Sequence, residues 1–137
     1  MEVITFGISS ERLQFQFSGS TLAVKLSGVF GLRECLGALQ AVRREAQRCQ
    51  AVALLLDVRG VALTLTPPQY VDFMRAALDQ PITRPVAFLA PKALMPWTSA
   101  HELLMLRRGL HRRFFASEAA ALRWIARLPP STPDLLG

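Results

Sequence analysis

The chain is poor in cysteine, histidine and charged residues, and it has no long apolar run. Two cysteines and two histidines occur among 137 residues, and charged residues make up 19%. The longest uninterrupted apolar run, AVALLL at 51–56, is far shorter than the ~20 residues that a membrane-spanning helix needs. The amino terminus MEVITFGISS has an acid at its second position and no basic segment, unlike a secretory signal. These absences predict a cytoplasmic protein without a transmembrane segment.

The two cysteines are not expected to form a disulfide. Cys35 and Cys49 fall on one predicted helix, where a rise of about 1.5 Å per residue separates them by ~21 Å. Cysteines whose Cα atoms lie more than ~7 Å apart cannot be bridged. Both are therefore predicted to be small buried apolar residues in a reducing compartment.

Neither the histidines nor the hydroxyl residues suggest catalysis. His101 and His111 lie too far apart, with too few cysteines or carboxylates nearby, to indicate a metal site. Each is expected to be solvated or to cap a helix. Ser99 lies close to His101 in sequence, but helix capping explains it, and no other nucleophile has an obvious base. The chain is predicted to be a non-enzyme without a cofactor.

Apolar residues, by contrast, make up 51% of the chain. A chain of this length can bury one substantial core, so residues 1–129 are predicted to form a single domain. The turn-forming sequence PPSTPDLLG indicates a flexible tail over 130–137. Because monomers rarely expose large apolar patches, the apolar surplus favours a subunit interface or a ligand groove.

The first part of the chain alternates apolar and polar residues, as half-buried strands do. This pattern predicts strands over 12–17 and 20–28, joined by a tight reversal at Ser18 and Gly19, and a further strand over 3–8. The chain therefore begins with a small antiparallel ribbon.

Helical and strand patterns then alternate. Apolar residues recurring every three or four positions predict a long amphipathic helix, and AVALLLDV has the uniform apolarity of a strand buried on both faces. In chain order the expected elements are helix 32–50, strand 51–58, helix 67–79, strand 84–91, helix 99–109, strand 111–116 and helix 117–128, the last capped by Ser117. Such alternation predicts an α/β fold: a single layered domain whose mixed, mostly parallel sheet has an antiparallel N-terminal ribbon and about four helices.

The sequence TPPQ at 66–69 has the form of a helix start. Thr66 can cap the helix with its hydroxyl, Pro67 suits the first helical position, and Gln69 can complete a capping box. Ser99 and Glu102 repeat this spacing in SAHE. Because prolines lack the N–H groups with which helix starts bind anions, this is a poor place for a phosphate site.

The order of elements and two stretches of sequence resemble the STAS domains, the anti-sigma-factor-antagonist fold of the SpoIIAA type. LLLDVRGVALTLTPPQYVDFM resembles the strand, loop and helix at the centre of that domain, and FFASEAAALRWIARL is similar to its close. The resemblance covers most of the chain. It implies a non-catalytic α/β domain that binds another protein or a small apolar ligand.

Regulatory members of this family carry a phosphorylatable serine between a strand and a helix. That motif falls here on Leu65, Thr66, Pro67 and Pro68, and the serine corresponds most naturally to Pro67. The departure predicts that the phosphoswitch is absent. Thr66 keeps the only hydroxyl and remains the candidate position in the switch loop.

Other residues are candidates for a ligand site or an interface. Asp57 and Arg59 lie at the end of a predicted strand, where open α/β sheets bind ligands, although a local ion pair is the favoured interpretation. Met95 and Trp97 belong to an expected apolar loop, and with Phe73 they could line a groove for a lipid or another apolar molecule.

The region 107–127 is rich in arginine and has one acid, Glu118. Its candidate anion-binding residues are Arg107, Arg108, Arg112 and Arg113. The favoured interpretation is that Phe114 and Phe115 face the core while the arginines extend into solvent, so nucleic acid is an unlikely partner.

The sequence favours a SpoIIAA-like domain that regulates by protein–protein contact, as a homodimer. An apolar ligand is the first alternative, and anion or nucleic-acid binding is the second.

Overall fold

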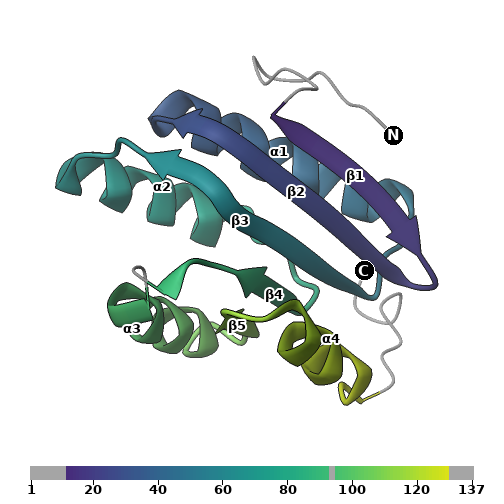
Figure 1. Ribbon diagram of the computed structural model, residues 1–137. Coiled ribbons are helices and arrows are strands. Elements are labelled where there is room, and N and C mark those ends of the chain that lie inside the picture. Colours follow the sequence, from purple (N-terminus) through teal and green to yellow (C-terminus); the bar gives the residue numbers. More distant parts are fainter. Residues whose placement is uncertain (1–11, 93–94, 130–137) are drawn as a thin grey trace.

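The computed structural model describes residues 12–92 and 95–129. They form one five-stranded sheet in the order β1-β2-β3-β4-β5 with four helices, in the α/β architecture that the sequence predicts (Figure 1). The bounds are β1 Leu13–Ser18, β2 Thr21–Phe30, α1 Leu32–Arg48, β3 Ala53–Leu63, α2 Pro67–Asp79, β4 Val86–Leu89, α3 Met95–Leu106, β5 Arg112–Phe115 and α4 Glu118–Ala126. The predicted strand over 3–8 and the predicted tail over 130–137 lie outside the described residues.

The N-terminal ribbon is confirmed. β1 and β2 pair antiparallel, with Ser18 opposite Thr21, and Gly19 in the turn has a φ of 62°. That left-handed conformation costs glycine little, which is why a tight reversal fits here. β2 to β5 are all parallel.

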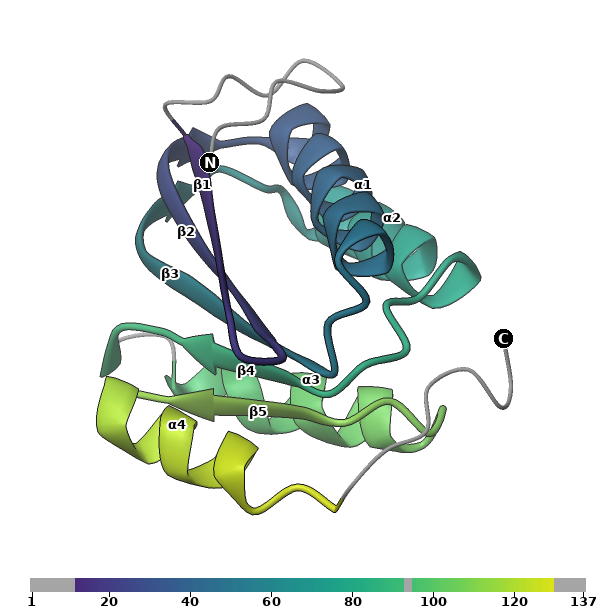
Figure 2. The ribbon, with the colours of Figure 1, turned by 90° about the vertical axis from the view of Figure 1, so that its right-hand side faces the viewer.

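The connections place the helices. Each crossover between neighbouring parallel strands runs in the same direction along the sheet, and right-handed crossovers then put α1, α2 and α3 on one face. These three helices meet in one apolar cluster that includes Leu39 of α1, Met74 of α2 and Met105 of α3. α4 follows the last strand and packs on the opposite face through Ala121 (Figures 1 and 2).

The main core lies between α1 and the sheet. Its fully buried side chains include Phe30, Leu13, Leu22 and Leu54. Both cysteines are free thiols, as predicted; Cys35 is buried within α1, whereas Cys49, the C-cap of the helix, is only partly buried, contrary to the prediction. Burial raises the pKa of Cys35 to about 11, so this thiol stays protonated at neutral pH.

Two boundaries differ from the sequence prediction by four residues or more. β3 was expected to end at residue 58, but it continues to Leu63 because it pairs with β2 as far as Phe30. A register shift between Lys25 and Ser27 accommodates this length, and Gly60 lies opposite Ser27 at a point where a Cβ atom would stand 3.3 Å from the serine Cβ. Glycine here serves a close approach within a strand rather than the loop that it suggests in the sequence.

The start of α3 is the second difference. The helix begins at Met95 rather than Ser99, so PKALMPW is not wholly a loop and Ser99 is not an N-cap. Glu102 does not close a capping box either. Its carboxylate accepts a hydrogen bond of 2.7 Å from the backbone N–H of Phe114 in β5. By contrast, α2 begins at Pro67 and the Ser117 hydroxyl caps α4, both as predicted.

Candidate functional site

The start of α2 is closed by its own side chains. The Thr66 hydroxyl accepts a hydrogen bond of 3.3 Å from the backbone N–H of Gln69, and the Gln69 side-chain oxygen accepts one of 2.9 Å from the backbone N–H of Thr66. Pro67 and Pro68 stand between them and have no N–H to offer. The predicted capping box is therefore confirmed, and it leaves this helix start without a free donor for an anion.

The start of α1 has only half of such a closure, because its N-cap, Gly31, has no side chain to accept a first-turn N–H. The Glu34 carboxylate accepts a hydrogen bond of 2.8 Å from the backbone N–H of Gly31, which caps the helix. This bond, together with other backbone contacts, keeps the pKa of Glu34 below its ordinary value. The Thr64 hydroxyl donates to the carbonyl of Phe30 and ties the ends of β2 and β3 together next to this cap. A carboxylate thus occupies the end of α1 where a bound anion would otherwise be favoured.

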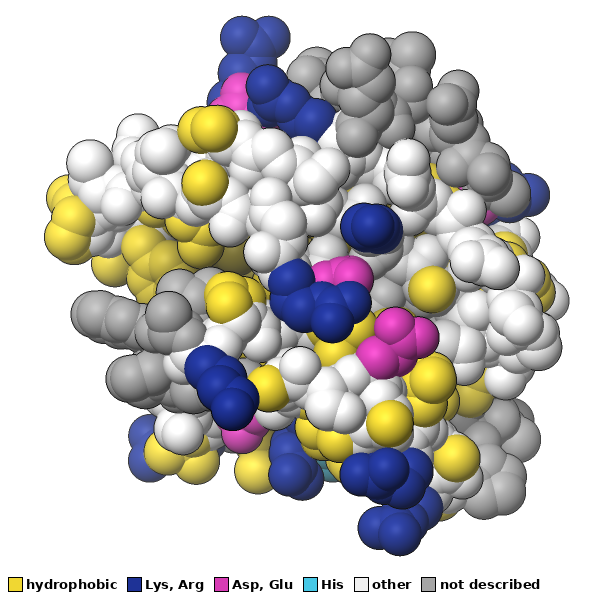
Figure 3. Space-filling model, in the orientation of Figure 1, with side chains coloured by type: hydrophobic (Ala, Val, Ile, Leu, Met, Phe, Trp, Pro, Cys, Tyr) yellow, Lys and Arg dark blue, Asp and Glu magenta, His cyan; other side chains and the backbone are white. Residues whose placement is uncertain are grey.

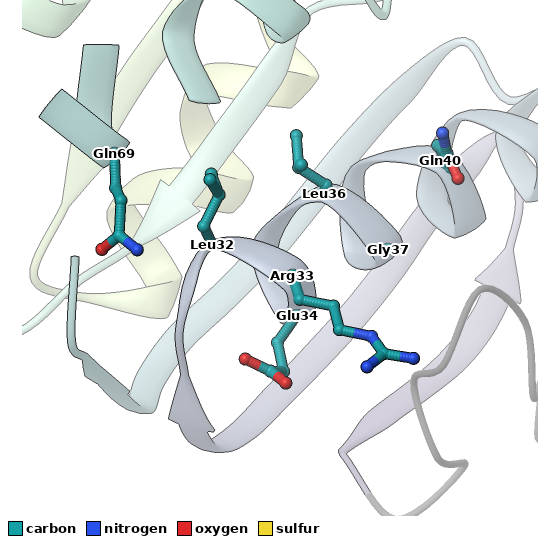
Figure 4. A pocket seen from close by; sticks show the side chains of 7 residues that line it. All are labelled: Leu32, Arg33, Glu34, Leu36, Gly37, Gln40 and Gln69. Atoms are coloured by element: carbon teal, nitrogen blue, oxygen red, sulfur yellow. The ribbon is translucent and has the colours of Figure 1, made fainter. Parts of the chain in front are cut away.

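A shallow open groove of about 630 Å³ lies beside these two helix starts. Its lining combines apolar, amide and charged residues, namely Leu32, Arg33, Glu34, Leu36, Gly37, Gln40 and Gln69. In Figure 4, Gln69 of α2 points toward Leu32, while Arg33 and Glu34 lie on the other side of α1. An open surface with an apolar centre and a charged border has the composition of a protein contact rather than of an enclosed ligand pocket.

Asp57 and Arg59 lie on the face of the sheet opposite α1, α2 and α3. Asp57 is not at a strand end, since β3 continues past it, although β4 stops at Leu89 beside it. The Asp57 carboxylate accepts hydrogen bonds of 2.9 and 2.8 Å from the Arg59 guanidinium, which lowers the pKa of Asp57. The favoured interpretation, a local ion pair, is confirmed. Figure 3 shows this face, with acidic and basic side chains close together at its centre.

The predicted apolar residues are not brought into one described pocket. Phe73 is half-buried and packs against the clusters that join α2 to the core. Met95 and Trp97 belong to the first turn of α3, but their side chains are outside the described part of the structure. The structure assigns Phe73 a packing role and leaves the apolar-ligand site as a prediction.

The four candidate arginines separate into two kinds. Arg107 and Arg108 are exposed just beyond α3, and Arg113 is exposed with its guanidinium 5.7 Å from the centre of the Phe115 ring. Arg112 is buried, with 9% of its surface exposed, and its guanidinium donates to the carbonyl oxygens of Ile82 and Arg84. The expectation that these arginines all extend into solvent is therefore wrong for Arg112. Because successive side chains of β5 point to opposite faces of the sheet, Arg112 lies on the face covered by α1, α2 and α3, and Arg113 lies on the other face.

Sequence reasoning also missed the environment of His101. Its ring contacts Phe88 and Phe114 edge-on, with ring centres 5.9 and 5.3 Å away, and these two phenylalanines stack on each other. Burial and the neighbouring Arg112 lower the pKa of His101 to about 4. The histidine is half-buried rather than fully solvated, and it lies within α3 rather than capping it. This environment depends on the register of β4 and β5, which places Phe88 beside Phe114. The sequence alone does not give that register.

Two further structural observations concern function classes. Within residues 12–92 and 95–129, no group of three histidine, cysteine or acidic side chains is placed to hold a metal ion. No helix in the same part of the chain is long and apolar enough to cross a membrane.

No protein-family model and no curated protein matches the chain. Solved structures do match. The chain is similar to an uncharacterized protein of the DUF3478 family with a SpoIIAA-like fold from Shewanella loihica, at 17% identity and a TM-score of 0.55, over 82% of this chain and 90% of that one. It is also similar to the anti-sigma factor antagonist SpoIIAA in its unphosphorylated form, at 13% identity and a TM-score of 0.50, over 85% of this chain and 99% of that one.

These likenesses, with the sheet order and helix placement, show that the chain has the SpoIIAA-like α/β fold. The fold expected from the sequence resemblance is thereby confirmed. At this level of identity the likeness extends to the fold alone.

Proposed function

We propose that this chain is a non-enzymatic regulatory domain that acts by binding another protein through the groove at the starts of α1 and α2. The observation that carries this proposal is the closure of the α2 start by Thr66 and Gln69, next to the Glu34 carboxylate at the start of α1. Because the N-terminus of α2 is satisfied internally, a phosphate group would find no free donor there, and the Glu34 carboxylate would repel a phosphate at the start of α1. The domain would therefore bind its partner constitutively, without a phosphoswitch.

The surface of the groove supports protein contact. Leu32 and Leu36 provide an apolar centre, while Arg33, Gln40 and Gln69 offer a polar border. SpoIIAA, the similar protein of solved structure, is an anti-sigma factor antagonist. An analogous regulatory role fits this chain, because it shares the SpoIIAA-like fold and lines the groove with its own residues. Two free cysteines support a cytoplasmic location.

Comparative affinity isolation from the native host tests this proposal. Tagged wild-type protein is compared with Leu36→Lys, which charges the apolar centre of the groove, and with Leu122→Lys, an exposed leucine of α4 that serves as the matched control. Quantitative mass spectrometry should show one protein retained by the wild type and the control and depleted at least severalfold in Leu36→Lys. A protein profile identical in all three samples would contradict the proposal.

We also propose that the domain self-associates as a homodimer. The supporting observation is the number of large apolar side chains that are exposed, among them Val29, Leu63, Val71 and Leu103. Surfaces of this kind mark interaction sites in otherwise well-packed domains. Val29 lies directly opposite the exposed Ala62, near the paired ends of β2 and β3.

Two predictions from the sequence remain as alternatives. An apolar ligand near Phe73 would shift the mass of the native protein in the presence of a fatty-acid panel. Anion binding by Arg107, Arg108 and Arg113 would give an affinity that falls steeply with salt, because counterions are released. Most candidate residues are already hydrogen-bonded, ion-paired or packed within the domain itself. Protein contact is therefore the function that the described surface supports best.

A further inference from the structure

β3 is longer than the strand beside it. It runs from Ala53 to Leu63, but β4 pairs with it only over Leu54–Asp57. From residue 58 onward, no described strand pairs with the side of β3 that faces away from β2. A free length of strand edge is thus left in the middle of the sheet, where β3 and β2 extend together beyond β4.

The hydrogen-bonding direction of this segment can be assigned. The Thr64 backbone N–H donates to the carbonyl of Phe30 at 3.0 Å, so residue 64 faces β2. Successive residues of a strand alternate between the two neighbouring positions. Ala62 therefore also faces β2, whereas the N–H and C=O groups of Val61 and Leu63 face the free edge.

Past Arg59 and the register shift at Gly60, the residues of this edge, 61–63, lack the features that normally prevent strand pairing. Edge strands are commonly protected by lysine, proline or an inward charge. Here the sequence from 58 to 63 is VRGVAL, Ala62 is exposed and Leu63 is 52% exposed. Val29, next to this segment on β2, is 57% exposed. In Figure 3, hydrophobic side chains gather in a hollow on the left of the visible face, below the start of α2.

Charge favours a second copy of the chain over an acidic peptide as the occupant. The chain carries a net charge of +6, which would repel another copy at most positions. The one charged residue of the edge, Arg59, is neutralised within its own chain by Asp57, with contacts of 2.9 and 2.8 Å. The edge therefore neither repels a like-charged chain nor offers an unpaired cation to an acid, and a copy of itself supplies the matching apolar strand.

We propose that two copies of this chain pair through residues 58–63 of β3, antiparallel about a twofold axis beside Ala62. In that arrangement Val61 of each copy exchanges both backbone hydrogen bonds with Leu63 of the other. The two Ala62 side chains then stand directly opposite each other as a non-hydrogen-bonded pair, and their small size allows the backbones to approach closely. This assignment rests on the proposed self-association and names the surface that produces it.

The test compares substitutions at the axis with the same substitutions at Ala119, an exposed alanine of α4. Sedimentation equilibrium should show a wild-type dimer. Ala62→Lys should raise the dissociation constant by about tenfold or more, because two lysines then face each other across the axis. Ala119→Lys should leave it unchanged. Circular dichroism checks that each variant is folded.

A cysteine at the axis provides a second readout that does not depend on weakening the dimer. With a mild oxidant, Ala62→Cys should form a covalent dimer on a non-reducing gel much faster than Ala119→Cys, since opposed cysteines at the axis lie within reach of each other. A protein that stays monomeric up to about 1 mM would overturn both the self-association and this assignment. A dimer that Ala62→Lys does not weaken, or that Ala62→Cys does not trap, would overturn the assignment alone.

Discussion

The Arg112 guanidinium in β5 donates a hydrogen bond of 2.6 Å to the backbone carbonyl of Ile82, in the connection between α2 and β4. The same side chain donates to the carbonyl of Arg84 at 3.1 Å, and Arg84 in turn donates from Nε to the carbonyl of Ala51 at 2.8 Å. Two arginines thus hold one connection against the sheet. Burial lowers the pKa of Arg112 to about 10, still far above neutral pH, so the cation persists inside the fold.

Replacing Arg112 should destabilise the domain. Arg112→Met leaves the carbonyls of Ile82 and Arg84 without these donors, at a cost of about 1–3 kcal/mol. Arg113→Met is the matched control, since Arg113 is exposed on the next position of the same strand, and it should change stability by no more than about 0.5 kcal/mol. Urea unfolding followed by circular dichroism measures both. Equal midpoints for the two variants would contradict the role given to Arg112.

Acid should destabilise the protein through His101. Its pKa is about 4 in the folded protein, whereas an unfolded histidine titrates near its ordinary value of 6.5. The unfolded chain therefore binds this proton first, and the contribution of neutral His101 is complete above pH ~6.5 and lost progressively down to pH ~4. Over this window the wild type should lose about 2 kcal/mol from this residue.

Urea unfolding at neutral pH and near pH 4.5 measures this loss. His101→Phe keeps an aromatic ring against the stacked Phe88 and Phe114 and should show a smaller loss of stability on acidification than the wild type. His111→Phe replaces the exposed histidine and should lose as much as the wild type does. A loss of the same size in His101→Phe would show that other groups, such as the carboxylates with lowered pKa, account for the acid sensitivity.

The capping box at the start of α2 should contribute measurably to stability. Thr66→Ala removes the oxygen that accepts the Gln69 N–H and should cost about 1 kcal/mol, whereas Thr66→Ser keeps the oxygen and should cost less. Thermal unfolding of the two variants checks this order. Intact-mass measurement of protein purified from its native host should also show Thr66 unphosphorylated, and a phosphorylated species there would contradict the closed helix start.

The sequence predicted the fold well where one local rule determines each element. Period-two alternation located β1 and β2, and the residues Thr66, Pro67 and Gln69 located the start of α2 to the residue. These signals depend only on neighbours in the chain. The fold class then followed from the order of elements and the handedness of their connections.

The remaining features depend on partners distant in the chain. β3 continues through Gly60 because β2 lies beside it, and Arg112 is buried because carbonyls of another segment accept its hydrogen bonds. His101 is enclosed by phenylalanines from two strands. None of these partners is visible in a local pattern, so Arg112 was expected to lie in solvent and His101 to be solvated or to cap a helix. The groove was missed for the same reason, since its lining comes from both α1 and α2.

The central claim is that a protein partner contacts the groove beside the starts of α1 and α2. The most direct measurement places a photoactivatable cross-linking amino acid at Gln40, in the groove, or at Leu122, exposed on α4, in cells of the native host. We expect a discrete cross-linked protein from position 40 that is absent from position 122. Equal products at both positions, or a partner captured only from position 122, would contradict the claim.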